Sequence, residues 1–331
     1  MATRTAPKIG YFLSCEEYTP RELLQQARLA EQAGFESLWI SDHFHPWNDE
    51  QGQSPFVWSM IGAISQVCSL PVTTAVTCPT VRTHPAVIAQ AAATSAVLAE
   101  HGFVLGVGSG EALNEHITGA RWPETDVRLQ MLEEAVEIIR ALWGGSFVDH
   151  HGTHYTLEQA RLYTLPERPP PLYVSGFGPK SAELAGRIGD GYITTTPDTE
   201  LIDAFRAAGG RDKPVQAGYK VCWGTDAEAC IETAHRLWAT QGLPGELSQT
   251  LPSPRHFEQA SSLVTPESTR DSIAYGDDVE RHVEAFRPYF EAGIDSVHIS
   301  QIGARHEQTN AEGFFAFYAD QVLPKLRALA S

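Results

Sequence analysis

The chain has 331 residues, and its hydrophobic fraction of 42% fits a globular protein with a sizeable core. Its formal net charge of −17 excludes nucleic acid as an expected partner, because an acidic surface repels phosphate backbones. No apolar run is long enough to cross a bilayer, no basic cluster marks a membrane-binding segment and no signal peptide is apparent, so we expect no membrane partner. The five cysteines are odd in number, scattered and without a Cys-x-x-Cys pair, which is typical of a reduced, cytoplasmic compartment.

Short apolar, β-branched runs alternate with longer amphipathic stretches along the chain. In chain order the runs predict strands at residues 9–13, 37–41, 72–77, 103–107, 172–175, 192–195, 216–222 and 296–302. Thr19 as N-cap, Pro20 at the first helical position and Gly34 at the end predict a helix between the first two strands. A second clear helix is predicted over residues 128–143. This alternation predicts a closed (β/α)8 TIM barrel formed by a single domain over residues 1–331.

Three segments are too long to be plain connections. Residues 44–56 follow the second strand, and residues 147–171 are predicted to form a small hairpin followed by a proline run. Residues 243–269, rich in Pro and Ser, lie between the seventh and eighth strands. Long segments in a compact domain are usually lids or binding loops, so we expect residues 243–269 to form a lid-like insertion.

Polar and ionisable side chains follow the predicted strand ends. The second strand delivers Asp42, His43, His45 and Trp47 within six positions, where the backbone turns to solvent. A TIM-barrel enzyme builds its active site from the loops at the carboxyl ends of its strands, so this cluster predicts an active site. The other strand ends contribute Glu16, Cys78, Glu111, Asn114, Gly176, Gly178 and Thr195. Ionisable groups, an indole and two glycine-rich turns at one mouth suit a flat ring with a phosphate-bearing tail.

Each residue type predicts a chemical role. His43 could accept a proton from a substrate hydroxyl, because imidazole titrates near neutral pH, and Glu111 could act as the complementary acid. Trp47 offers an apolar face and one N–H donor to a delocalised ring. Asp42 could bond the cofactor or tune the site. The backbone N–H groups at residues 176–179, where a helix begins, suit an anion. Packing or solvation alone could also explain His43, Trp47 and Glu111.

Several motifs together resemble those of the luciferase-like flavin and deazaflavin oxidoreductases, in particular the group that contains the glucose-6-phosphate dehydrogenase dependent on coenzyme F420. The matching pieces are Ser-Asp-His-Phe-His-Pro-Trp at 41–47, Cys-Pro-Thr-Val-Arg-Thr-His-Pro-Ala-Val-Ile-Ala-Gln at 78–90, Gly-Val-Gly-Ser-Gly-Glu-Ala-Leu-Asn-Glu at 106–115 and Leu-Ala-Gly-Arg-Ile-Gly-Asp-Gly at 184–191. They cover most of the chain in the same order. The resemblance implies a TIM barrel, a homodimer and a hydride transfer between an alcohol or carbonyl substrate and C5 of F420.

The resemblance also implies roles for individual residues. It implies His43 as the base, Trp47 as the stabiliser of the reduced cofactor anion and Glu111 as the proton partner of the cofactor ring. A non-proline cis peptide is implied near Ala75-Val76. The residues implied to hold the cofactor are Asp42, Ala75, Val76, Cys78, Asn114, Gly176, Phe177, Gly178 and Pro179. We expect Glu16, Thr195 and Asp198 to face the substrate.

The chain departs from the sugar-phosphate enzymes where the phosphate would bind. Asp198 stands after the sixth strand where the resemblance implies a lysine, and residues 246–250 lack a second lysine. Asp271 stands near an implied arginine, although Arg270 or Arg255 could restore a phosphate site. A carboxylate repels a phosphate and is costly to desolvate, so we expect a small neutral alcohol or carbonyl compound rather than glucose 6-phosphate.

Three alternatives remain at this point. The same fold could use FMN, as a reductase or monooxygenase, because FMN shares the ring shape and the phosphate-bearing tail. A barrel hydrolase could place a divalent metal on His43 and His45, with His150, His151 and His154 nearby in sequence. A flavin-binding relative without catalysis is the third. We expect no metal site, because the fifth, sixth and eighth strand ends offer no further His or Asp ligand.

Overall fold

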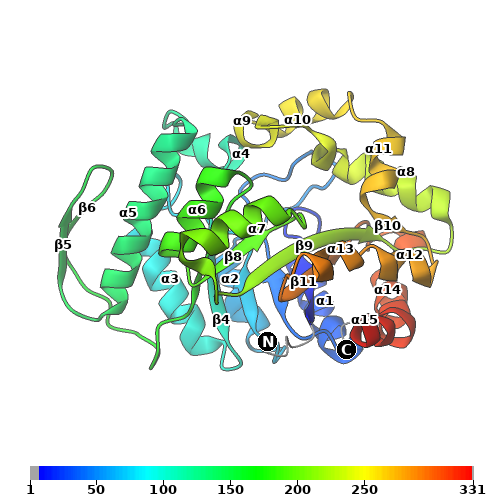
Figure 1. Ribbon diagram of the computed structural model, residues 1–331, viewed down its shortest axis with the longest axis horizontal. Helices are drawn as coiled ribbons and strands as arrows, with labels where there is room; N and C mark the ends of the chain where they lie inside the picture. Colours follow the sequence, from blue (N-terminus) through cyan, green and yellow to red (C-terminus); the bar gives the residue numbers. More distant parts are fainter. Residues whose placement is uncertain (1–6, 330–331) are drawn as a thin grey trace.

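The computed structural model describes residues 7–329 and has a closed barrel of eight parallel strands (Figure 1). The barrel strands are β1 (Lys8–Leu13), β2 (Leu38–Ile40), β3 (Val72–Thr74), β4 (Phe103–Val107), β7 (Leu172–Ser175), β8 (Gly191–Thr194), β9 (Val215–Cys222) and β11 (Ser296–Gln301). Each pairs in parallel with the next, and β11 pairs with β1 to close the ring. A two-residue strand, β10 (Ala274–Tyr275), pairs with the carboxyl-terminal end of β9. The predicted TIM barrel is confirmed.

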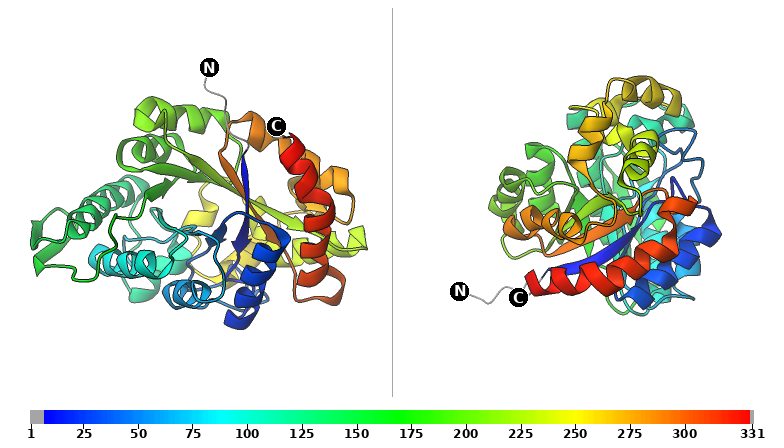
Figure 2. Two further views of the ribbon diagram at one scale, coloured as in Figure 1. Left: turned by 90° about the horizontal axis from the view of Figure 1, so that it is seen from below. Right: turned by 90° about the vertical axis from the view of Figure 1, so that its right-hand side faces the viewer.

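Helices surround the strands (Figures 1 and 2). They include α1 (Pro20–Ala33), α2 (Val57–Ile64), α3 (Pro85–Leu98), α5 (Thr125–Trp143), α6 (Pro179–Ile188), α7 (Thr199–Phe205), α8 (Ala227–Trp238), α12 (Val279–Glu284), α13 (Arg287–Glu291), α14 (Ala311–Phe317) and α15 (Leu323–Leu329). Helix α1 has the predicted ends: Thr19 and Glu22 form a reciprocal capping box, and Gly34 adopts φ 87°. Helix α5 begins at Thr125, three residues before the predicted start. Among residues 7–329, no helix combines the length and the apolar character needed to span a bilayer.

Large rings set against glycines fill the interior of the barrel. The Trp39 indole stacks on the His298 imidazole with ring centroids 4.5 Å apart. A Cβ atom on Gly218 would lie 2.7 Å from the Trp39 ring, and one on Gly10 would clash with His298. The interior is therefore a packed core, and room for chemistry is left only at its ends.

One of the long segments forms the predicted hairpin, and the insertion is helical. β5 (Val148–His151) and β6 (Thr156–Ala160) form an antiparallel hairpin. The insertion, residues 243–269, contains α9 (Leu247–Thr250), α10 (Pro254–Ser261) and the start of α11 (Pro266–Ser272). Figure 1 shows these helices together at one end of the barrel. Phe257 of α10 packs with Leu113 and Trp47, which fixes that end as the one where β2 and β4 finish.

Candidate active site

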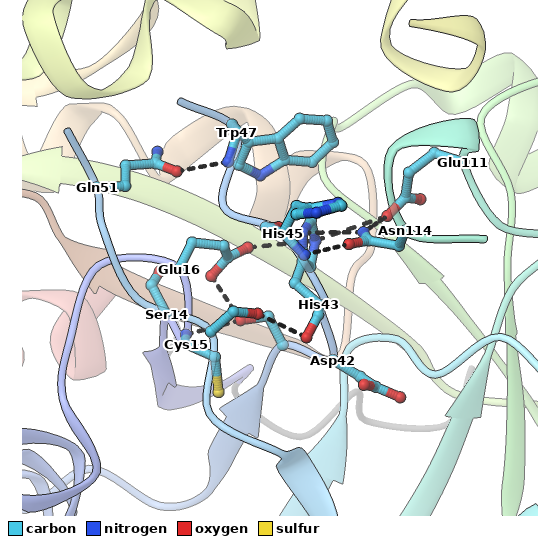
Figure 3. Close-up of polar contacts among 12 residues, drawn as sticks. Ser14, Cys15, Glu16, Asp42, His43, His45, Trp47, Gln51, Glu111 and Asn114 are labelled. Carbon is cyan, nitrogen blue, oxygen red and sulfur yellow. Dashed lines mark hydrogen bonds and ion pairs between the residues drawn. The ribbon is translucent and has the colours of Figure 1, made fainter. Parts of the chain in front are cut away.

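The loops after β1, β2 and β4 bring one histidine and two carboxylates together (Figure 3). Nε2 of His43 lies 3.3 Å from Oε1 of Glu16 and 3.7 Å from Oε1 of Glu111. The exposed fraction of the side chain is 4% for Glu16 and 23% for Glu111, so Glu16 is the buried carboxylate beside the imidazole and Glu111 the partly solvent-exposed one. Three separate strand ends therefore bring these three ionisable side chains into one cluster.

Asn114, on α4 (Ala112–Glu115), fixes the geometry of this centre. Its Oδ1 accepts from the backbone N–H groups of Phe44 and His45, at 2.8 and 3.0 Å, which leaves its Nδ2 as the donor. Nδ2 donates to Oε1 of Glu111 at 2.6 Å and lies 3.0 Å from Nδ1 of His43. The carbonyl of His45 also lies 3.1 Å from Nδ1. Because Nδ1 faces both a donor and an acceptor, either tautomer of His43 keeps a partner there.

Glu16 is buried but carries a charge that its surroundings favour. The Ser41 hydroxyl donates to Oε2 of Glu16 at 2.7 Å. Burial alone would raise the pKa of Glu16, but His43, Lys220 and this hydrogen bond together lower the pKa below its usual value. An ionised carboxylate therefore stands where positive charge develops when His43 takes up a proton.

Trp47 links this centre to the insertion. Its indole lies 5.0 Å from the His43 ring, between centroids, at an interplanar angle of 58°. On its other side the Phe257 ring meets it edge-on, with centroids 5.0 Å apart. The backbone N–H of Trp47 donates to Oε1 of Gln51 at 2.9 Å, which holds the loop. The indole is thus oriented by both the barrel loop and the insertion.

Asp42, the neighbour of His43, belongs to a separate ion-pair network. Its Oδ2 accepts from the Thr77 hydroxyl, and its Oδ1 accepts from Nη2 of Arg82 at 2.9 Å. Nε of Arg82 lies 3.5 Å from Oε1 of Glu115, and the backbone N–H groups of Val81 and Arg82 donate to Oε2 of Glu115. Burial raises the pKa of Glu115 to about 7. This network ties the loop after β3 to the loops after β2 and β4.

Two further strand ends fit a flat ring with an anionic tail. The Ala75-Val76 peptide bond is cis, and both residues pack on the apolar cluster that contains Tyr173 and Ile193. Val76 also faces the backbone of β4 where it ends, since a Cβ on Gly108 would lie 2.8 Å from Cγ2 of Val76. This surface is apolar, which suits the face of a tricyclic ring.

The turn at residues 176–179 offers the anion site. Helix α6 begins at Pro179, its first turn has no acidic residue, and a Cβ on Gly178 would meet nothing within 4 Å. Ser181 fills the space beside Gly176 and accepts from the Gly178 N–H at 3.1 Å. A helix N-terminus that is open on one side and has no acidic residue in its first turn can attract a phosphate. Lys180 points elsewhere, to an exposed ion pair with Asp126 at 2.7 Å.

A sequence profile of the luciferase-like monooxygenase family matches residues 5–296. The chain belongs to this family. The chain is 35% identical to an F420-dependent glucose-6-phosphate dehydrogenase of Amycolatopsis mediterranei, over 97% of this chain and 99% of that protein. It is 36% identical to an F420-dependent glucose-6-phosphate dehydrogenase of Nocardia farcinica, over 98% of this chain and 99% of that protein. A solved F420-dependent secondary alcohol dehydrogenase, in complex with an F420-acetone adduct, superimposes with a TM-score of 0.87 at 31% identity, covering 97% of this chain and 99% of that chain. The F420-dependent tetrahydromethanopterin reductase of Methanopyrus kandleri shares the fold, with a TM-score of 0.76 at 17% identity.

The predicted resemblance to this family is therefore confirmed, as is the cis peptide at Ala75-Val76. Of the residues expected to face the substrate, Glu16 lies beside His43 in the candidate active site. The Thr195 carbonyl accepts from the Tyr289 hydroxyl at 3.0 Å, and Asp198 caps α7 by accepting from two backbone N–H groups. The substrate contacts of these residues stay predictions.

Sequence reasoning missed two residues of this site. Arg82 and Lys220 carry no distinguishing sequence context, yet Arg82 pairs with Asp42 and Lys220 acts on Glu16. Asn114 was expected at the site and lies there, with its amide bonded to His43, Glu111 and the loop after β2; its contact with the cofactor stays a prediction. For Lys220 a signal existed, because alternation along β9 puts it on the same face as Gly218, inside the barrel.

The metal alternative finds no support in the geometry. In the part of the chain that the structure describes, no group of three or more His, Cys, Asp or Glu side chains could hold a metal ion. Nδ1 of His45 faces the Leu113 carbonyl at 2.9 Å, away from His43, and His150 pairs with Glu134 in the hairpin.

Proposed function

We propose that the protein is an F420-dependent oxidoreductase that interconverts a small neutral alcohol and the corresponding carbonyl compound. The observation that carries the proposal is the placement of Nε2 of His43 within 3.3 Å of Glu16 and 3.7 Å of Glu111, with the Trp47 indole 5.0 Å from the His43 ring. Relatives named F420-dependent dehydrogenases match nearly the whole chain at 35–36% identity. When bound, the deazaflavin supplies a two-electron hydride acceptor or donor.

The residues of the chain handle the proton. We assign His43 as the general base that accepts the proton of the substrate hydroxyl, a role that typically contributes about 10² to 10⁴ in rate. Glu16, at 3.3 Å, is the anion that the resulting imidazolium faces. Glu111, the more exposed of the two carboxylates, is the proton partner on the cofactor side. Trp47 stabilises the anionic form of the ring through its N–H and its face.

The cofactor contacts follow from the fit described above. Ala75, Val76 and Cys78 form the surface against the ring, with Asn114 at its edge and Asp42 contributing its free lone pairs. The turn at residues 176–179 binds the phosphate of the tail through backbone N–H groups and the positive end of α6.

A neutral substrate fits this chain better than a sugar phosphate. The Asp198 carboxylate stands on α7 where a phosphate-binding lysine was implied, and it accepts from the N–H groups of Glu200 and Leu201. Arg270 is neutralised by Glu228, with two hydrogen bonds of 3.0 and 2.6 Å. The insertion instead packs the fully buried Phe257 ring against Trp47, so an apolar group and no cation stands behind the indole. A solved relative of high similarity is named a secondary alcohol dehydrogenase, which agrees with this reading.

We also propose that residues 1–331 act as one domain, with the insertion as the cover of the site. The insertion is attached to the barrel by the Phe257, Leu113 and Trp47 contacts and by a hydrogen bond of 2.9 Å from Nη2 of Arg128 to Oε1 of Gln249. A cover of this kind excludes water from the site of hydride transfer.

Assembly and compartment complete the proposal. Helices α2 and α3 contain no Asp, Glu, Lys or Arg, and Phe56, Val87, Val97 and Leu98 are exposed on or beside them. A charge-free face with exposed apolar side chains suits a second copy of the chain, so we propose a homodimer through this face. By light scattering, the V87E/V97E variant should then be monomeric, while L263E, a control at another exposed apolar residue, should stay dimeric. A monomeric wild type would refute the proposed homodimer.

The compartment that we propose is the cytoplasm. All five cysteines are buried free thiols, as we expect there.

The cofactor assignment is tested by titrating the purified protein with F420 and, separately, with FMN, and following fluorescence. We expect F420 to bind in the micromolar range or tighter and FMN to bind at least about tenfold more weakly, a difference of about 1.4 kcal/mol. Tighter binding of FMN would move the protein to the flavin-dependent branch of the family. Failure of both would remove the proposed function.

A further inference from the structure

A buried lysine lies under the proposed centre and has no part in the reaction as described so far. Lys220, on β9, is 8% exposed, and its Nζ donates to Oγ of Ser14 at 3.0 Å. The hydroxyls of Ser14 and Ser300 share a hydrogen bond of 2.9 Å. The Trp238 ring covers the ammonium, with its centroid 3.4 Å from Nζ. Neutral groups alone would leave this cation poorly compensated, because burying an unpaired charge is expensive.

The compensation comes from two consecutive carboxylates. Glu16 and Glu17 are both nearly fully buried, and they are the charged groups that act on Lys220. Glu17 is held by the indole N–H of Trp238 at 2.7 Å and by the backbone N–H of Gly303 at 2.5 Å. Burial lowers the pKa of Lys220 to about 8, although both carboxylates oppose that shift. Lys220 is therefore a cation at neutral pH. Of the two carboxyl groups that act on it, burial raises the pKa of Glu17, whereas the pKa of Glu16 is lowered.

The remaining ionisable groups near these carboxylates are neutral. Burial raises the pKa of the Cys15 thiol next to Glu16 and of the Tyr11 and Tyr18 phenols next to Glu17. A hydrogen bond donated by the Cys222 thiol to Cys230, together with burial, raises the pKa of Cys222, and the charge of Glu17 raises it further. The cations that act on Glu16 are thus His43, once it is protonated, and Lys220.

We propose that Lys220 is a positioning residue whose ammonium keeps Glu16 ionised, so that an anion faces Nε2 of His43 before the proton arrives. The consequence for catalysis rests on the proposed function of His43 as the base, whereas the charge state of Glu16 does not. Without Lys220, Glu16 would keep the hydrogen bonds from the Ser41 hydroxyl and from the backbone but would lose its permanently charged neighbour, and burial would favour its protonated form. The imidazolium formed during the reaction would then lose its anion.

The test compares Lys220→Met with Lys220→Arg, which keeps the charge, and with Glu16→Gln alone and in combination. Infrared difference spectra of the apo-protein at neutral pH report protonated carboxyl groups. We expect a carboxylic acid band that appears in Lys220→Met, is absent from the wild type and Lys220→Arg, and disappears in Lys220→Met/Glu16→Gln. Glu17→Gln in the same background distinguishes the two carboxylates. Lys220→Gln carries the same expectation if Lys220→Met does not fold.

Steady-state rates supply the second readout. We expect kcat of Lys220→Met to fall about tenfold to a hundredfold near neutral pH, with KM changed far less, and to recover as rising pH ionises Glu16. The double variant should be no slower than Glu16→Gln, because both changes remove the same anion. A Lys220→Met protein without the new band, or with a band that only Glu17→Gln removes, would overturn the proposal. A wild type that fails to use F420 would refute the proposed function and leave the infrared result decisive for Lys220.

Discussion

Asp42 and His43 are adjacent in sequence, yet they belong to two polar clusters that differ in whether their cation is permanent. In the Asp42 cluster, Arg82 stands between two buried carboxylates, and its charge is present at all times. In the His43 cluster, two carboxylates face one ring nitrogen, and the matching cation exists only when the ring is protonated. A cluster whose charges are matched in advance holds loops together. A cluster that is completed by a proton is suited to receive one.

The first prediction tests the reactive side of this comparison. His43→Ala should lower kcat by about two to four orders of magnitude, because it removes the general base, and should leave F420 affinity within a few fold. Rapid-mixing kinetics and the fluorescence titration measure both quantities. His45→Ala is the control, since Nδ1 of His45 faces the Leu113 carbonyl. Turnover that survives in His43→Ala would show that another group takes the proton.

The second prediction tests the structural side. Arg82→Met should lower the free energy of unfolding at neutral pH by roughly 3 to 5 kcal/mol, because it leaves Asp42 and Glu115 buried without their cation. Urea denaturation gives the value. Arg187→Met, which breaks an exposed ion pair with Glu133, should cost less than about 1 kcal/mol. Equal losses in the two variants would mean that the Arg82 network does not stabilise the loops.

The third prediction uses the pH dependence of the same network. The folded-state pKa of Glu115 is raised to about 7, so the folded protein binds more protons than the unfolded chain between the ordinary carboxyl pKa and about 7. Stability is therefore lost as pH rises through this window, by at most about 3 kcal/mol. Glu115→Gln lacks this loss.

The stability of Glu115→Gln relative to the wild type should thus grow from about pH 5 to about pH 8, because only the wild type has a carboxyl group to ionise at this position. Urea denaturation at the two pH values tests it. Parallel stabilities at both pH values would show that Glu115 is ionised without penalty, contrary to the raised pKa.

The sequence was sufficient for the features that local rules determine. Strand periodicity, the caps of α1 and the strand-end cluster at residues 42–47 all follow from neighbouring residues. The amide of Asn114 binds the backbone of Phe44, 70 positions away, and no local pattern encodes such loop-to-loop contacts. Lys220 was readable only from the alternation along β9, and its partners Ser14 and Glu16 come from the other end of the chain.

The central claim is that the chain oxidises a neutral alcohol with F420 through His43. The most direct measurement compares initial rates of F420 reduction by propan-2-ol and by glucose 6-phosphate under identical conditions. We predict turnover with the alcohol and none above background with the sugar phosphate, because Asp198 and the paired Arg270 offer no phosphate site. Turnover with glucose 6-phosphate and none with propan-2-ol would contradict the account.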